Sequence, residues 1–445
     1  MGPAAALAQA AANLRQKGNT LELNNASAEQ LAQWEHALAA EYHAIVAKGL
    51  NLDLTRGKPS AEQLTLSNGM DGILKGNYTS PDGVDCRNYG GLDGIMEARA
   101  IGAAILGVPV ESVLAGGNSS LTLMHQAMTI AHLFGLDGSD SAWANEETVK
   151  FICPVPGYDR HYSVCEHLGI EMITVPMTSN GPQMDEVERL IAEDSSIKGM
   201  WCVPKYSNPT GVVYSDDTVA RIAALGKIAA PNFRVFWDNA YGVHDLSDNP
   251  AQLASIMDAC IAAGTEDSVL QFASTSKITF AGAGVAFMAA SSSNLSGFKQ
   301  SLGFMTIGPD KVNQLRHVHF FAEDNALKTH MQKHAAIIKP RFSSVLTHLE
   351  SAFGDNDLGD WESADGGYFI SFDTQPGLAK EVVKMAGDAG VKLTPAGATF
   401  PYGNDPKDSN IRIAPTVPTV AQVDEAMEVF VVCVKLASVR QAIAG

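Results

Sequence analysis

The chain is short of cations. It has 31 Lys and Arg against 49 Asp and Glu in 445 residues, which gives a formal net charge of -18 at pH 7. Surfaces that bind nucleic acids need clustered Lys and Arg to neutralise phosphates, and the sequence contains no basic run of that kind. The composition therefore argues against a nucleic-acid partner.

Long apolar runs and paired cysteines are also missing. No uninterrupted apolar stretch approaches the length that spans a bilayer. The six cysteines are scattered, without a Cys-x-x-Cys pair or the His spacing of a zinc site, so we expect no metal site and buried thiols in a reducing compartment. The Ala-rich N-terminus lacks the basic segment and the apolar core of a secretory signal. These absences predict a cytoplasmic protein with no membrane partner.

What is present is the composition of a globular protein with a large core, with 46% hydrophobic and 18% charged residues. Apolar strand-like runs alternate with helical patterns between residues 113 and 277, which is typical of βαβ units and a sheet buried on both faces. Residues 310–350 predict a helical connector with a candidate break at Pro340, and a compact α+β region follows residue 367.

Lys277 stands out in the middle of the chain. It follows an apolar run and lies in a stretch of Ser, Thr, Ala and Gly with no neighbouring charge. An amine whose surroundings disfavour the ammonium form becomes a nucleophile toward carbonyls, as a Schiff-base lysine must be. The residues alone do not exclude the alternative that Lys277 is an ordinary lysine whose side chain extends into solvent.

Polar side chains follow several of the predicted strands, among them Tyr158, Asn208, Asp238 and Lys277. The carboxyl ends of parallel strands meet at one edge of a sheet, where ligands bind. Between another strand and a helix, the Gly-Gly-Asn-Ser-Ser run at 116–120 predicts an anion site at a helix start, although these polar residues would also serve as plain N-caps. The sequence therefore predicts a ligand site at this edge.

Five short motifs follow one another along the chain. They are Pro-Gly-Tyr at 156–158, Ser-Asn-Pro-Thr-Gly at 207–211, Trp-Asp-Asn-Ala-Tyr at 237–241, Ser-Thr-Ser-Lys at 274–277 and Ile-Arg-Ile-Ala at 411–414. In this order they resemble the motifs of the class I/II aminotransferases, which are enzymes of fold type I that depend on pyridoxal 5′-phosphate. Any one motif is weak, but the ordered set is specific.

Four further motifs narrow the resemblance. They are Leu-Thr-Arg-Gly-Lys-Pro at 54–59, Arg-Asn-Tyr-Gly-Gly at 87–91, Val-Pro-Gly-Tyr-Asp-Arg-His at 155–161 and Ile-Gly-Pro-Asp-Lys-Val-Asn-Gln-Leu-Arg-His at 307–317. These are similar to motifs of the type Ic bacterial aspartate aminotransferases, a subgroup close to the MocR-like proteins. No helix-turn-helix region precedes the matching part, which disfavours a transcription regulator.

The resemblance implies an α/β fold of two domains. The large domain, 63–330, would hold the cofactor on a mainly parallel seven-stranded sheet between helices. The smaller α+β domain would be formed by 27–62 and 331–445, and 1–26 would be an N-terminal extension. The implied activity is amino transfer from aspartate to 2-oxoglutarate by a ping-pong mechanism in a homodimer with shared active sites. Alternatives are an aminotransferase for aromatic or kynurenine-type substrates, a pyridoxal-phosphate-dependent β-lyase, and a non-enzymatic regulator that binds the cofactor.

The resemblance also implies roles around the cofactor ring. Lys277 would hold the cofactor as an internal aldimine and then move a proton between the substrate α-carbon and C4′ of the cofactor. Asp238 would keep the ring nitrogen protonated, and Tyr241 and Asn208 would bond to O3′. The remaining contacts are Tyr158 stacked on the ring, a phosphate cradle of Asn118, Ser119, Ser120, Ser274 and Ser276, and Tyr89 reaching the phosphate of the neighbouring subunit. His161 would support the stacking or be a satisfied core histidine.

For the substrate, the resemblance implies that Arg412 binds the α-carboxylate as a bidentate pair. Two departures from the family pattern follow. The position eight residues after Lys277, where an Arg usually meets the phosphate, is Val285. The segment 301–308, which usually supplies an Arg for a side-chain carboxylate, has no cation. The candidates for that second role are Arg160 first and then the turn Arg56, Gly57 and Lys58, whose two cations would otherwise be ordinary solvated charges.

Overall fold

The structure, a computed structural model, describes residues 21–362 and 364–445, so most of the predicted N-terminal extension lies outside the described residues. Two compact units are present. One comprises Ala61–Ala336 with Asp365–Gly367, and the other comprises the chain up to Ser60, Ile337–Ala364 and Tyr368–Gly445. The predicted domain boundaries stay a prediction. No helix among the described residues is long and apolar enough to cross a membrane.

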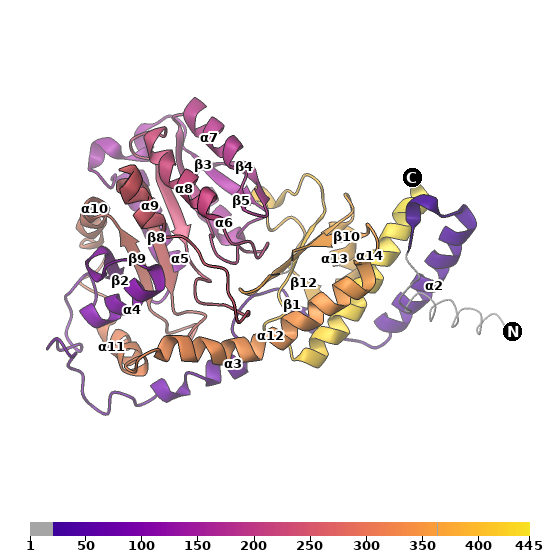
Figure 1. Ribbon diagram of the computed structural model, residues 1–445, viewed down its shortest axis with the longest axis horizontal. Coiled ribbons are helices and arrows are strands. Elements are labelled where there is room, and N and C mark those ends of the chain that lie inside the picture. Colours follow the sequence, from indigo (N-terminus) through magenta and orange to yellow (C-terminus); the bar gives the residue numbers. More distant parts are fainter. Residues whose placement is uncertain (1–20, 363) are drawn as a thin grey trace. The chain divides into compact units, whose positions relative to one another are not determined.

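The first unit is built on an eight-stranded sheet flanked by helices (Figure 1). Its order is β2-β9-β8-β7-β6-β3-β4-β5. The five strands from β8 to β4 run parallel, and β9 and β5 are antiparallel to their neighbours. The strands are β2 (Val113–Ala115), β3 (Lys150–Val155), β4 (Glu171–Thr178), β5 (Gly181–Pro182), β6 (Ile197–Cys202), β7 (Arg234–Asp238), β8 (Val269–Ser274) and β9 (Ala286–Ala290).

The predicted mainly parallel sheet is confirmed, with eight strands where seven were predicted. The additional strand, β5, has two residues and forms a short hairpin with the end of β4. The central strands β6, β7 and β9 are buried along their whole length, as expected for apolar strands covered on both faces. The accompanying helices are α3 (Ala61–Thr65), α4 (Met96–Leu106), α5 (Ser120–Leu133), α6 (Asp159–His167), α7 (Met184–Glu193), α8 (Asp216–Ala224), α9 (Ile256–Ala263), α10 (Ser292–Leu302) and α11 (Lys311–Phe320).

The helical connector is interrupted at a different place from the one predicted. The helix α12 (Ala326–Phe353) continues through Pro340, and the break lies before it, where Asn325 has φ of 60°. A proline within a helix removes one backbone hydrogen bond. Ile338 and Phe342, on either side of it, are buried, and we attribute the continuity of the helix to this packing.

The second unit contains two small sheets. β1 (Leu52–Leu54) pairs in parallel with β12 (Val391–Leu393), and β10 (Gly359–Trp361), β11 (Ile370–Thr374) and β13 (Asn410–Ile413) form an antiparallel sheet. The helix α2 (Ala28–Val46) begins at a capping box formed by Ser27 and Gln30. This helix packs against α14 (Val420–Ala444), and α13 (Ala379–Asp388) also contacts α14 (Figure 1).

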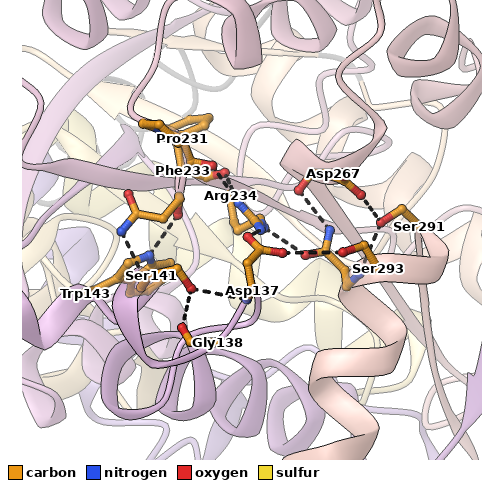
Figure 2. A network of polar contacts seen from close by, with 12 residues as sticks. Asp137, Gly138, Ser141, Trp143, Pro231, Phe233, Arg234, Asp267, Ser291 and Ser293 are labelled. Atoms are coloured by element: carbon orange, nitrogen blue, oxygen red, sulfur yellow. Dashed lines mark hydrogen bonds and ion pairs between the residues drawn. The ribbon is translucent and has the colours of Figure 1, made fainter.

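A polar network fixes the end of β7 that is remote from its carboxyl terminus (Figure 2). Its centre is the buried Arg234, whose Nη2 donates to Asp137 at 2.6 Å and whose Nε donates to Asn294 at 3.0 Å. Asn294 in turn donates to the carbonyl of Asp267 at 2.8 Å. The guanidinium therefore ties the start of β7 to the segment before β3 and to α10, and through Asn294 to the segment before β8.

We expect Arg234→Ala to lower the free energy of unfolding by about 3–5 kcal/mol, because it removes the shared partner of a buried network. Arg189→Ala is the matched control. Arg189 is exposed and pairs with Glu186 and Glu193, and such solvated surface pairs contribute little to stability. Urea denaturation measures both variants. Equal losses in the two would contradict the role given to Arg234.

Candidate active site

The carboxyl ends of the parallel strands bring the predicted residues to one edge of the sheet. Asp238 is the last residue of β7, and Lys277 comes three residues after β8, which pairs with β7. Asn208 follows β6, and Tyr158 follows β3 as the N-cap of α6. Residues 159–161 form the first turn of α6, which directs His161 to the sheet.

Asp238 is a buried carboxylate with one oxygen bonded and one available. Its Oδ2 lies 3.0 Å from Nε2 of His161, and both side chains are almost fully buried. Its Oδ1 is buried and has no hydrogen-bond partner in the described part of the chain. Buried polar atoms are normally paired, so this oxygen is positioned to accept a hydrogen bond from a ligand.

Aromatic rings hold His161 in place. Its ring stacks on Trp201 with the centroids 4.1 Å apart and the planes 7° apart, and Tyr158 meets it edge-on at 4.9 Å. Burial raises the pKa of Tyr158 to about 12, although the charge of Lys277 opposes the shift. The phenol is therefore uncharged at neutral pH. His161, whose role the sequence left open, is fixed by its bond to Asp238.

Lys277 lies on the turn after β8, with its Nζ 4.8 Å from the ring centroid of the buried Tyr241. Its backbone carbonyl lies 3.3 Å from Nε2 of His244. Burial, and next the charge of Lys277, lower the pKa of His244 to about 3, so this histidine is neutral. Asn208 is also buried, on the loop that follows β6. An amine, a phenol and an amide thus lie near the edge where Asp238 ends its strand.

Two further histidines support the Lys277 turn from α12. Nε2 of His330 lies 2.7 Å from the carbonyl of Ile278 and 3.1 Å from Nε2 of His334. The other ring nitrogen of His334 contacts the amide of Gln63 at 3.0 Å. Burial, and next the nearness of His330, lower the pKa of His334 from 6.5 to about 4. The backbone beside Lys277 is therefore held by neutral histidines.

This pKa shift predicts acid sensitivity. The pKa of His334 is lower in the folded chain than in the unfolded chain, so the unfolded chain binds the proton more tightly between pH 6.5 and 4. Stability is therefore lost as pH falls through that window, by about 2 kcal/mol at pH 5 for this histidine. Urea denaturation at pH 7.5 and 5.0 measures the loss. His334→Asn, which cannot take up the proton, should show a smaller drop between the two pH values. An identical drop would show that other groups cause it.

The predicted anion cradle lies at the start of α5. Ser119 is the N-cap but its side chain makes no cap bond, so the N–H groups of the first turn are not capped by it. Ser276 Oγ donates to the carbonyl of Asn118 at 3.0 Å, and Ser274 Oγ donates to Ser276 Oγ at 3.1 Å. Ser120 is the first residue of the helix. Hydroxyl groups from the turn that carries Lys277 therefore adjoin the helix start.

Val285 contributes no charge to this region. Its side chain is buried in an apolar cluster with Phe287 and Ile278. Its N–H donates to Thr275 Oγ1 at 2.9 Å, and its carbonyl accepts from the N–H of Thr275 at 2.9 Å. The Val285 position therefore braces the Lys277 turn through its backbone.

The residues present fit pyridoxal 5′-phosphate. The unpaired Oδ1 of Asp238 suits a protonated ring nitrogen, the helix start suits a phosphate, and Lys277 suits an aldehyde. No group of three or more His, Cys, Asp or Glu side chains within 21–362 and 364–445 could hold a metal ion.

The predicted substrate residue Arg412 lies in the second unit. Its guanidinium is 4.7 Å from the ring centroid of Phe369, and its Nε donates to Thr394 Oγ1 at 3.3 Å. Gly57 packs against the same ring, where an added Cβ would come within 2.4 Å of it. Arg56 and Lys58 flank this glycine and are exposed. Phe369 thus orders both the guanidinium and the turn.

The two predicted residues that remain are exposed in the first unit. Arg160 on α6 makes no hydrogen bond or ion pair with any described residue, and Tyr89 is 82% exposed. Their roles, and those of the other predicted site residues, stay predictions. Trp201 and His244 were not predicted as site residues from the sequence. Trp201, in the middle of a buried strand, gave no sign of a site, whereas His244 follows Tyr241 by three residues and could have been found.

Comparison with known proteins agrees with this geometry. The model of the aspartate amino-transferase family matches residues 26–445. An aspartate aminotransferase of Corynebacterium glutamicum is 44% identical over 421 residues, which cover 94% of this chain and 97% of that protein. A crystal structure of an aspartate transaminase from Corynebacterium glutamicum has a TM-score of 0.92 at 44% identity and covers 95% of this chain and 100% of that one.

A more distant structure shares only the fold. LysN, an α-aminoadipate aminotransferase from Thermus thermophilus complexed with N-(5′-phosphopyridoxyl)-L-leucine, has a TM-score of 0.70 at 18% identity, with coverage of 100% of this chain and 99% of that one. The match of the family model to nearly the whole chain and the 44% identity over nearly the whole of a relative decide the assignment. The chain belongs to the aspartate aminotransferase family, the aminotransferases of fold type I.

Proposed function

We propose that the protein transfers the amino group of aspartate to 2-oxoglutarate by a ping-pong mechanism, with pyridoxal 5′-phosphate joined covalently to Lys277. The observation that carries the proposal is Asp238, whose Oδ1 is buried without a partner while its Oδ2 is held by His161. The cofactor, when bound, supplies a ring that withdraws electrons from the substrate α-carbon. The names of the relatives from Corynebacterium glutamicum support aspartate as the donor.

The side chains divide the work in this proposal. The carboxylate of Asp238 would hold the proton on the ring nitrogen, and Nζ of Lys277 would take the proton from the substrate α-carbon and pass it to C4′ of the cofactor. Tyr241 and Asn208 bond to the ring oxygen O3′. Arg412 binds the substrate α-carboxylate, for which a planar guanidinium is suited.

The proposed assembly is a homodimer in which Tyr89 reaches the phosphate of the neighbouring subunit. Tyr89, Phe304 and Ile307 are 82%, 91% and 62% exposed. They lie on adjacent segments, because a Cβ added to Gly308 would come within 2.6 Å of the carbonyl oxygen of Gly90. Contiguous exposed apolar side chains are typical of an interface, and this surface supports pairing of two copies.

A substrate panel tests the proposed activity. The reconstituted protein is given aspartate, tyrosine, kynurenine and alanine, each with 2-oxoglutarate, and keto acid and ammonia are measured. We expect the highest kcat/KM with aspartate and no ammonia. A higher kcat/KM with kynurenine or tyrosine would reject the proposed donor. Release of ammonia without an acceptor would identify a lyase, and full cofactor occupancy without any turnover would identify a binding protein.

Arg160 is proposed as the cation for the side-chain carboxylate of the substrate. We expect Arg160→Ala to lower kcat/KM about tenfold for aspartate and to leave alanine, which lacks that carboxylate, nearly unchanged. Steady-state kinetics with the two donors measure the ratio. An equal loss for both donors would reject this role, and Arg56→Ala and Lys58→Ala would then be the next variants to compare.

A further inference from the structure

The proposed phosphate site lacks the cation that the family pattern places at position 285. Val285 is buried and apolar, and its backbone is occupied by Thr275. A phosphate near the start of α5 must then be bound mainly by N–H and hydroxyl groups. Two neighbouring residues of α11, Asn313 and Gln314, hold the backbone that carries those N–H groups. The inference rests on the proposed function, because it concerns the phosphate of the cofactor.

Gln314 holds the turn between β2 and α5. Its side chain is fully buried. Its Nε2 donates to the carbonyl of Ala115 at 3.0 Å and to that of Gly116 at 3.4 Å, and its Oε1 accepts from the N–H of Ile95 at 2.9 Å. One neutral side chain therefore directs two successive carbonyl groups of the turn toward α11.

Asn313 does the same for the loop between Lys277 and β9. Its Nδ2 donates to the carbonyls of Ala283 and Gly284, both at 2.9 Å. Its own N–H is held by the N-cap Asp310, at 2.9 Å, so the helix start that carries it is itself fixed. Two carbonyls of the second loop therefore also face α11.

The same peptides also carry N–H groups on the side opposite to the held carbonyls. In a trans peptide the N–H points away from the C=O. The peptides whose carbonyls are held at Gly116 and Ala283 carry the N–H groups of Gly117 and Gly284, and neither N–H has an acceptor among the residues of the described chain. Gly284 is buried, and a Cβ added to it would lie 3.2 Å from the backbone N of Ser276.

These two N–H groups adjoin the cradle. Ala286, two residues after Gly284, donates its N–H to the carbonyl of Gly117 at 2.7 Å, so the two loops run side by side. Ser276 bonds to the carbonyl of Asn118. Backbone N–H groups without acceptors are donors for an anion, and here two adjacent loops supply one each.

We propose that Asn313 and Gln314 are positioning residues for the phosphate of the cofactor. By holding the carbonyls of Ala283 and Gly116, they fix the N–H groups of Gly284 and Gly117 as phosphate donors. Preorganised dipoles of this kind bind an anion without having to be reoriented. These neutral groups would take over part of the role that the family resemblance assigns to a cation at position 285.

The test measures the contribution of the phosphate to binding separately from that of the rest of the cofactor. The full-length chain, freed of cofactor, is titrated with pyridoxal 5′-phosphate and with pyridoxal, and binding is followed by tryptophan fluorescence. We expect Asn313→Ala and Gln314→Ala each to raise the dissociation constant of pyridoxal 5′-phosphate about tenfold, and that of pyridoxal by less than about twofold. Gln300→Ala, which removes the exposed Gln300 of α10, is the matched control and should change neither constant.

Each result decides between the alternatives. If Gln314→Ala does not fold, Asn313→Ala, whose side chain is only half-buried, still tests the proposal. An equal rise for both ligands would show a purely structural role and overturn the proposal, as would no rise for either. If the wild-type chain binds pyridoxal 5′-phosphate no better than pyridoxal, the proposed function fails. If it binds the phosphate form better and the variants retain that preference, only the inference on Asn313 and Gln314 fails.

Discussion

Lys277→Ala is expected to abolish amino transfer, with turnover reduced by about a thousandfold or more. In the proposed mechanism one amine performs two tasks, since it bonds to the cofactor aldehyde and also transfers the proton of the substrate. The Nζ of Lys277 lies against the ring of Tyr241, and its carbonyl is held by His244. Removing the side chain therefore removes the reacting atom while the bonds that hold the turn remain.

Two measurements separate the loss of chemistry from a loss of folding. Borohydride reduction followed by mass spectrometry of the wild-type protein should find the cofactor on the peptide that contains Lys277, and Lys277→Ala should carry none. Lys227→Ala, at an exposed position, is the control and should retain both turnover and the adduct. A Lys277→Ala protein that still turned over aspartate and carried the adduct on another lysine would refute the assignment.

The edge of the sheet could be predicted because its signals are local. Asp238 and Lys277 each end or follow a run of apolar residues, and parallel strands place such positions together wherever the strands pair. The positions of Asp238 and Lys277 at the ends of predicted strands were therefore enough to place them at the same edge of the sheet. The same reasoning found the start of α5, since a Gly-Gly turn before a helix leaves N–H groups unpaired.

What could not be predicted depends on contacts between distant segments. Gln314 bonds to Ala115, 199 positions away, and nothing in the residues around it indicates that partner. His161 is set by the plane of Trp201, a contact formed only when β3 and β6 pair. The continuity of α12 through Pro340 likewise depends on burial of its neighbours, which outweighs a local signal.

Asp238→Ala is expected to lower kcat by about a hundredfold or more, because in the proposed mechanism this carboxylate keeps the ring nitrogen protonated. Asp238 is the one site residue whose two oxygens have separate tasks in the structure, with Oδ2 bonded to His161 and Oδ1 without a partner among the described residues. Asp217→Ala, on the exposed face of α8, is the control and should leave kcat unchanged.

A permanent positive charge on the ring nitrogen should restore part of the kcat that Asp238→Ala loses. A cofactor methylated at the ring nitrogen carries a permanent positive charge, and the smaller Ala leaves room for the methyl group. We expect this analogue to raise the kcat of Asp238→Ala and to lower that of the wild-type protein, in which the methyl group meets Oδ1. Steady-state kinetics with the two cofactors measure both effects. If the analogue fails to raise kcat although it binds to Asp238→Ala, then Asp238 acts through His161 and the packing around it, and its role at the ring nitrogen is wrong.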